Sequence, residues 1–270
     1  MHITTCSVVE DPVTPTFSCQ LFDGHIVPNP VSVRVASIPP HLGLYRSPAE
    51  RIESIVHFAE TLVPRNHRVL IPIPYGSDCN IESLAKYSED MVQGISVRTG
   101  LHTLGVEPAP GETVFIETSG CPVIVICLPG HTRMVVAKAD LDSLIGTFGR
   151  CRGRTPRRPD DAIIAMMLDH LGRPTMGEHV LVSVILGVGA SGSDDPDRYS
   201  FYDQDPELMQ AHVGSEYGQT AFEDGRISLL AVIRRQCELQ DIRSEHVFSL
   251  GPDVREEKGR KVVAVSFHTP

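Results

Sequence analysis

The pattern of apolar and polar residues predicts a strand and then a helix near the start of the chain. Residues 31–35 alternate as Val-Ser-Val-Arg-Val, which is typical of a half-buried strand. Ser47, Pro48 and Glu50 then match a capping box, with serine as N-cap, proline at the first helical position and glutamate three residues after the cap. We predict a helix that ends before Pro64. Its buried face is expected to contain the apolar residues at helical spacing, Ile52, Ile55, Val56, Ala59 and Leu62.

Apolar runs farther along the chain predict a series of strands. The clearest is a β-hairpin formed by residues 122–128 and 134–139, which are separated by the turn sequence Pro-Gly-His-Thr. Other strands are expected at 69–73, 113–117, 180–188, 247–250 and 261–267. A helix capped by Asp160 or Asp161 should run to Leu171, and another should span 227–239. The longest loops are expected at 150–161 and 191–216.

This mixed order of hairpins and helices predicts an α+β fold, in which mixed β-sheets form layers flanked by helices. A doubly wound parallel sheet would need a regular alternation of strands and helices instead. No internal repeat or long linker interrupts residues 1–270, so we expect a single domain.

Composition and charge limit the class of protein. With 41% hydrophobic residues over 270 positions, the chain has enough apolar material for a folded core. It lacks an apolar run of about 20 residues and a signal-peptide pattern, so we expect a soluble, cytoplasmic protein without a membrane partner. Its 24 basic and 34 acidic residues disfavour nucleic-acid binding. The seven cysteines form no CxxC pair, which argues against a zinc ribbon or a disulfide framework.

The strongest candidate for chemistry is the segment at 117–122, which reads Glu-Thr-Ser-Gly-Cys-Pro. If the hairpin turns through four residues, Cys121 lies opposite Asp140, and Lys138 lies diagonally from it on the same face. A nearby ammonium favours the thiolate, which attacks electrophiles or binds metal. The alternative is that Cys121 is a small buried residue at the start of a strand and that Lys138 extends into solvent.

Five arginines crowd the predicted loop at 150–158, and Arg152 is one of them. On an acidic protein, such a cluster could receive phosphate or another anionic ligand. The alternative is an ordinary solvated loop.

The order of these motifs resembles the laccase-domain proteins, the YfiH-like family whose members are also named multicopper polyphenol oxidoreductases or purine nucleoside phosphorylases. The run Cys-Pro-Val-Ile-Val-Ile-Cys-Leu at 121–128 is similar to the start of that family's ADCLPVLL…HAGWRG core. Tyr75 and Gly76 occupy the place of its HG motif, and residues 226–236 resemble its late LDL…NRxQL helix. The resemblance extends over most of the chain and implies the layered fold of the family.

In that family one cysteine and two histidines bind a catalytic zinc, and the enzymes cleave purine nucleosides with phosphate or deaminate adenosine. Cys121 matches the metal-binding cysteine, but Tyr75 and Lys138 stand where the two histidines would be. Lysine is protonated at neutral pH, and tyrosine is rarely deprotonated enough to bind zinc. We therefore predict an empty metal site and no cofactor.

The main hypothesis for function is a metal-free enzyme that acts on a small polar or nucleoside-like molecule. Cys121 would be the nucleophile, Lys138 would lower its pKa, and Tyr75 would donate to a developing oxyanion or transfer a proton. The residues expected to bind the substrate are Ser119, Gly120, Asp140 and Arg152. The first alternative is a catalytically inactive protein of the same fold that serves as a binding or scaffold protein.

The second alternative is a cysteine-dependent protein glutamine deamidase. Ser119-Gly120-Cys121 is similar to the SGC tripeptide of the cytotoxic-necrotising-factor type deamidases, in which the cysteine attacks a protein glutamine and a histidine acts as base. His131 falls at the tip of the predicted hairpin, on the order of 20 Å from Cys121 at about 3.3 Å per residue. The base would therefore have to be a more distant histidine, such as His102 or His268.

Overall fold

The first of two mixed β-sheets contains the N-terminal strands and the last strand of the chain. The computed structural model describes residues 7–9, 16–20, 31–74, 80–82, 88–101, 103–128, 133–149, 153–173, 180–185, 205–223, 226–250 and 260–268. The strands of this sheet are β1 (Ser7–Val9), β2 (Thr16–Gln20), β3 (Val31–Ser37), β4 (Arg68–Ile73), β6 (Ser88–Val92), β7 (Ile95–Leu101), β9 (Glu112–Thr118) and β18 (Lys261–Phe267). Their order is β1-β2-β3-β18-β9-β4-β7-β6. We call it the first sheet.

The second sheet is built around the hairpin that the sequence predicts. Its strands are β5 (Asn80–Glu82), β8 (Thr103–Val106), β10 (Val123–Leu128), β11 (Arg133–Lys138), β14 (Leu181–Ile185) and β17 (Val247–Leu250). Their order is β17-β14-β10-β11-β8-β5. Two short ribbons lie apart from both sheets, and their strands are β12 (Gly146–Gly149), β13 (Gly153–Pro156), β15 (Phe222–Glu223) and β16 (Arg226–Ile227).

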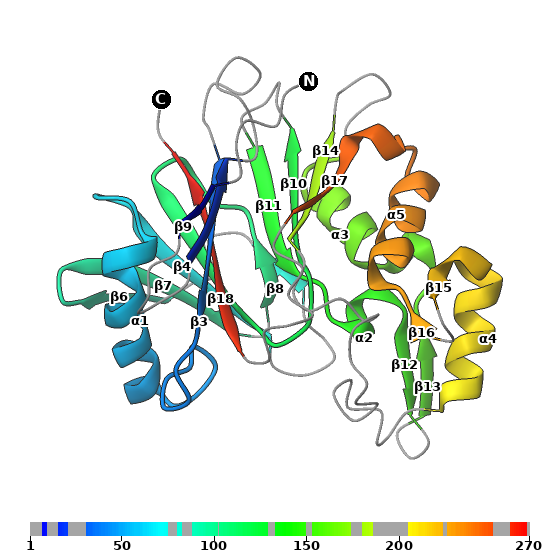
Figure 1. Cartoon of the computed structure of the whole chain (residues 1–270), viewed down its shortest axis with the longest axis horizontal. Coiled ribbons are helices and arrows are strands. Elements are labelled where there is room, and N and C mark those ends of the chain that lie inside the picture. The colour runs from blue at the N-terminus through cyan, green and yellow to red at the C-terminus, as the bar shows by residue number, and fades with distance from the viewer. Residues whose placement is uncertain are drawn as a thin grey trace.

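Helices cover the outer faces of the two sheets, so the molecule has four layers (Figure 1). The helices are α1 (Pro48–Leu62), α2 (Leu141–Leu144), α3 (Ile163–His170), α4 (Pro206–Glu216) and α5 (Leu229–Leu239). Helix α1 covers the first sheet, whereas α3 and α5 cover the second. Among the described residues, no helix combines the length and the apolarity that a membrane span requires.

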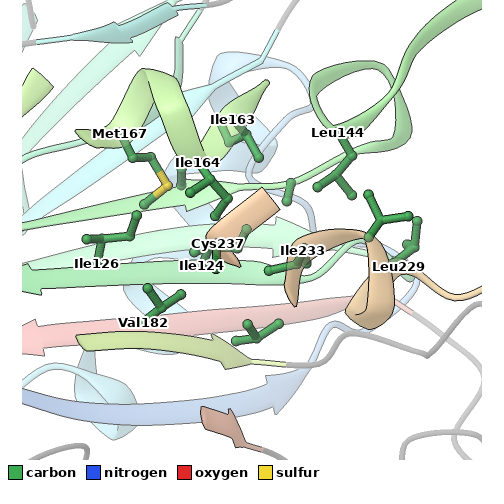
Figure 2. Close-up of a cluster of buried hydrophobic side chains, with 14 of the residues drawn as sticks. Ile124, Ile126, Leu144, Ile163, Ile164, Met167, Val182, Leu229, Ile233 and Cys237 are labelled. Atoms are coloured by element: carbon green, nitrogen blue, oxygen red, sulfur yellow. The ribbon is translucent and has the colours of Figure 1, made fainter. Parts of the chain in front are cut away.

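Alternating residues of the strands divide the core into three clusters. In β10, Val123 and Val125 belong to the core between the sheets, whereas Ile124 and Ile126 belong to the cluster under the helices. Figure 2 shows Ile124 and Ile126 beside residues of α3 and α5, including Ile164 and Ile233. Because side chains alternate between the faces of a strand, a fully apolar strand such as β10 can supply both cores.

These elements confirm the α+β prediction. The capping box of α1 forms as expected, since Ser47 Oγ accepts from the Glu50 backbone N–H and Glu50 accepts in return from the Ser47 N–H. Strand β10 pairs with β11 so that Leu128 lies opposite Arg133 and Val123 lies opposite Lys138, which is the predicted register. The division into one domain stays a prediction.

The predicted start of α3 is wrong. Residues Pro159–Asp161 form a 3-10 turn, and α3 begins only at Ile163, with extended Ala162 as its cap. No side chain caps this helix. Asp161 and Asp160 therefore lie one and two residues before the N-cap position. Similarly, α5 begins at Leu229 after an Ser228 cap.

Two further expectations need correction. The predicted loop at 191–216 contains α4, whose first backbone N–H groups donate to Asp205, its N-cap. The predicted buried face of α1 included Ile52, but this residue is 48% exposed, and Phe58 is fully buried instead. The buried face of α1 is therefore rotated towards Phe58.

Candidate functional site

Cys121 lies in the turn that connects the two sheets. The first sheet supplies β9, which ends at Thr118, and the second sheet supplies β10, which begins at Val123. Thr118 Oγ1 donates to the Cys121 carbonyl oxygen over 2.5 Å, which closes the turn. Gly120 has φ of 136°, a backbone conformation that favours glycine. The sequence between β9 and β10 therefore determines where the thiol lies.

The register of the hairpin brings Lys138 to the same end of the second sheet. The Ala139 N–H donates to the Pro122 carbonyl over 2.8 Å, so the pairing continues one step beyond the strands and leads to Cys121 opposite Asp140. Val123 and Val136 point into the core between the sheets. Cys121 and Lys138 each lie two residues from one of these valines, so both continue that inward face. The predicted juxtaposition of Cys121 and Lys138 is thus present.

The net effect on the thiol differs from the sequence expectation. Burial raises the pKa of Cys121, the charge of Lys138 lowers it, and the carboxylate of Asp140 raises it again. The pKa ends above its ordinary value, because the thiol is largely removed from water although Cys121 as a residue is only half-buried. Lys138 therefore acts in the expected direction, but burial outweighs it.

A tyrosine that sequence reasoning missed lies next to Lys138. The ammonium of Lys138 is 5.2 Å from the centroid of the Tyr45 ring, within the range of a cation–π contact. Tyr45 belongs to the segment between β3 and α1, far from the Cys121 turn in the sequence. No local motif around Tyr45 points to this contact, since it depends on how the two sheets pack.

Of the four residues predicted to bind a substrate, three lie within the described part of the chain. Ser119 is exposed and Gly120 is half-buried, and both precede Cys121 in the turn. Asp140 is the N-cap of α2, and its carboxylate accepts from the Ser143 N–H over 2.8 Å. One oxygen of Asp140 is therefore already engaged in the fold.

Tyr75 and Arg152 lie outside the described residues. Strand β4, which precedes Tyr75 by two residues, runs parallel to β9, so the two strands end on the same side of the first sheet. Within the arginine cluster, Arg157 donates to the backbone carbonyls of Asp142 and Asp161. Arg157 thus contributes to the fold rather than to an open anion site.

The described side chains around Cys121 do not assemble a set of zinc ligands. Such a site needs about three nitrogen, sulfur or oxygen ligands in their deprotonated forms. Cys121 has a raised thiol pKa, and the group beside it is a lysine ammonium. Among the described residues, no three histidine, cysteine, aspartate or glutamate side chains gather in a way that could bind a metal.

The geometry also separates Cys121 from His268, the histidine considered as a deamidase base. Strands β9 and β18 are antiparallel, with Phe267 opposite Glu112 and Lys261 opposite Thr118. His268 therefore lies at the start of β9, whereas Cys121 follows its end. The length of β9 separates them by roughly 20 Å, at about 3.3 Å per residue. His268 is too far away to take a proton from Cys121, while His102 and His131 lie outside the described residues.

The fold is similar to those of several solved structures. The chain is similar to the Bacillus licheniformis hypothetical protein YfiH, with 13% identity, a TM-score of 0.54, and coverage of 92% of this chain and 96% of that one. It is also similar to YlmD from Geobacillus stearothermophilus, with 10% identity, a TM-score of 0.55, and coverage of 95% and 92%. The Neisseria meningitidis protein NMB0706 of family DUF152 gives 11% identity, a TM-score of 0.54, and coverage of 88% and 95%.

These similarities confirm the expected resemblance at the level of the fold. No protein-family model matches the sequence, and no curated protein does. The expected likeness to the cytotoxic-necrotising-factor type deamidases is not shown. The chain therefore has the YfiH fold, and a fold alone does not specify an activity.

Proposed function

We propose that this chain is a YfiH-fold enzyme that acts on a small polar or nucleoside-like molecule at the Cys121 turn, without a resident metal. The observation that supports this most directly is the placement of a thiol and an ammonium, from Cys121 and Lys138, on one inward face at the end of the hairpin. Cys121 is the nucleophile, and Lys138 stabilises negative charge. Tyr75, Ser119, Gly120 and Arg152 keep the roles expected from the sequence.

The reaction class is attack by sulfur on an electrophilic carbon. The thiol proton leaves to solvent, a sulfur–carbon bond forms, and an electron pair of the carbon–oxygen double bond moves to the oxygen, which faces the ammonium. Burial and Asp140 both raise the pKa of Cys121, and Lys138 opposes them. Lys138 is therefore the group on which formation of the thiolate depends.

The test is the pH dependence of Cys121 alkylation by iodoacetamide, followed by mass spectrometry. Cys127 and Cys237 provide internal references, because both are buried and burial raises the pKa of each to about 12. Cys121 should react faster than either reference at pH 7. Lys138→Met should move the midpoint of the Cys121 profile to higher pH, with a loss of about tenfold in rate at pH 7 if the midpoint moves by one pKa unit.

Lys138→Arg is the matched control, since it keeps a positive charge at the end of β11 and should retain most of the wild-type rate. Protection of Cys121 by millimolar adenosine or inosine would support a nucleoside-like ligand. An unchanged midpoint in Lys138→Met would contradict the proposed role of lysine.

A binding or scaffold protein is the second candidate, and the raised pKa of Cys121 is the observation that favours it. A buried, protonated thiol behaves as a small apolar residue rather than a nucleophile. In that case Cys121 should react no faster than Cys127 at pH 7, and Cys121→Ala should leave ligand protection against thermal unfolding unchanged.

A further inference from the structure

We infer that Glu117 and Arg260 are positioning residues of the candidate site and that they hold Tyr45 against Lys138. This inference deepens the proposed function and rests on it. Neither residue forms a described hydrogen bond with Cys121, and although Glu117 begins the segment at 117–122, no role of its own is predicted for it from the sequence. Their effect is exerted through the segment at 38–47, which connects β3 to α1.

The carboxylate of Glu117 organises this segment from inside the first sheet. Its Oε2 accepts from two successive backbone N–H groups, those of Leu44 at 2.6 Å and Tyr45 at 3.3 Å. The Glu117 side chain is only 9% exposed. A buried carboxylate needs such donors, because an unpaired buried charge is costly. The segment at 38–47 therefore supplies the donors that Glu117 requires.

Arg260, the residue just before β18, completes this arrangement. Its Nη1 donates to Glu117 Oε1 over 2.9 Å, and its Nη2 donates to the Leu42 carbonyl over 2.5 Å. A Cβ added at Gly43 would lie 2.7 Å from Arg260 Nη1, so the backbone packs directly on the guanidinium. The ion pair between Glu117 and Arg260 thus fixes the path of the segment rather than merely neutralising a charge.

Tyr45 is bound to Glu117 at both of its ends. Its backbone N–H donates to the Glu117 carboxylate, and its phenol oxygen accepts from the Glu117 backbone N–H over 3.2 Å. A tyrosine attached at both ends cannot swing its ring away without breaking one of these bonds. The ring therefore presents a fixed face to the Lys138 ammonium, 5.2 Å from its centroid.

This arrangement has a consequence for Cys121. A lysine side chain is long and flexible, and its ammonium is strongly hydrated. The fixed ring of Tyr45 gives the Lys138 ammonium a partner close to the turn, so its charge stays where it lowers the pKa of the thiol. Loss of the ring position should release the ammonium to solvent and weaken that effect.

The experiment is a set of pH–rate profiles for Cys121 alkylation in full-length variants that remain folded by circular dichroism. The plateau at high pH reports access to the sulfur, and the midpoint reports its charge environment. Glu117→Gln and Tyr45→Leu should each raise the midpoint, with a loss of about three- to tenfold in rate at pH 7. Tyr45→Phe keeps the ring but loses the bond from the Glu117 N–H to the phenol oxygen, so its midpoint should lie between those of the wild type and Tyr45→Leu.

The double variant separates positioning from a general loss of structure. If Glu117 acts through Tyr45, Glu117→Gln should add no further rise in midpoint when Tyr45 is already leucine. Glu89→Gln is the matched control, because Glu89 forms an exposed ion pair with Arg98 on β6 and β7, and it should leave the profile unchanged. If Glu117→Gln does not fold, Tyr45→Leu with Arg260→Lys provides the same comparison.

The outcomes distinguish this inference from the proposed function. An unchanged midpoint in Lys138→Met refutes the coupling of thiol and ammonium, and with it both proposals. A midpoint that rises in Lys138→Met but not in folded Tyr45→Leu refutes only the positioning inference. Additive effects of Glu117→Gln and Tyr45→Leu would also overturn it, because the two residues would then act independently.

Discussion

Replacing Glu107 by glutamine should destabilise the protein in a pH-dependent way. Glu107 follows β8, and its carboxylate is paired twice with Arg133, at 2.6 and 2.9 Å, and once with His170 Nε2, at 3.1 Å. Arg133 also donates to the carbonyls of His170 and Leu171 at the end of α3. The cluster therefore ties the last turn of α3 to β8 and β11.

The magnitude follows from the pKa of Glu107. Burial raises it, but hydrogen bonds and charges from Arg133 and His170 lower it from 4.5 to about 2. At 1.36 kcal/mol for each pKa unit, this corresponds to roughly 3 kcal/mol as an upper value. The Arg133 side chain is 41% exposed, so solvent screening reduces the expected loss for Glu107→Gln to about 1–2 kcal/mol at pH 7.

The assay is urea unfolding of the wild type and Glu107→Gln at constant salt from pH 7 to pH 2.5. Because the folded pKa of Glu107 is lowered, its stabilisation is present above pH 4.5 and is lost as the pH falls towards 2. The difference in the free energy of unfolding between the two proteins should therefore become smaller over that range. Glu238→Gln, which removes an exposed pair with Arg235, should cost less than about 0.5 kcal/mol. A loss of unfolding free energy that is the same at pH 7 and pH 2.5 would refute the reasoning. So would a loss at pH 7 no larger than that caused by Glu238→Gln.

Two other perturbations test the ends and the middle of the sheets. The pKa of His67 is lowered by burial and then by the charge of His268, and that of His268 is lowered by burial and then by Arg34. The unfolded chain therefore binds protons more readily than the folded protein, and the free energy of unfolding should fall as the pH drops below about 6.5. In urea titrations, His67→Gln should make the free energy of unfolding depend less on pH. An unchanged pH dependence would count against this prediction. Gly105→Ala should lower stability by about 3 kcal/mol or more in thermal unfolding, because the new Cβ would lie 2.5 Å from the Cβ of Ala137 on the neighbouring strand. A nearly wild-type melting temperature would show that this contact is relieved easily.

Local signals in the sequence were sufficient wherever neighbouring residues determine the structure. The start of α1 depends on Ser47 and Glu50, which bond to each other's backbone three residues apart. The register of β10 and β11 depends on a short turn, and that register was enough to predict that Lys138 approaches Cys121. Helix α4 has a comparable local signal in Asp205 followed by Pro206, but its apolar residues show weak helical periodicity, and the helix was missed.

The features that could not be predicted depend on contacts between distant segments. Tyr45 lies against Lys138 while Glu117, 72 residues away from Tyr45, bonds to its backbone and its phenol oxygen. The direction of the Cys121 pKa was also beyond the sequence. The charge of Lys138 could be predicted from register, but the larger effect of burial arises from the packing of two sheets against each other.

The backbone that presents Cys121 and Lys138 is fixed by other residues. The Cys121 turn is determined by the end of β9, the start of β10 and a hydrogen bond from Thr118, and none of these depends on a metal ligand. The position at 138 lies at the end of β11, where the register alone sets its place opposite Val123. A lysine there needs only a partner for its ammonium, and the Tyr45 ring is one. Because the apolar cores rather than the site stabilise the backbone that presents these positions, we expect replacements of the side chains at 121 and 138 to preserve the fold.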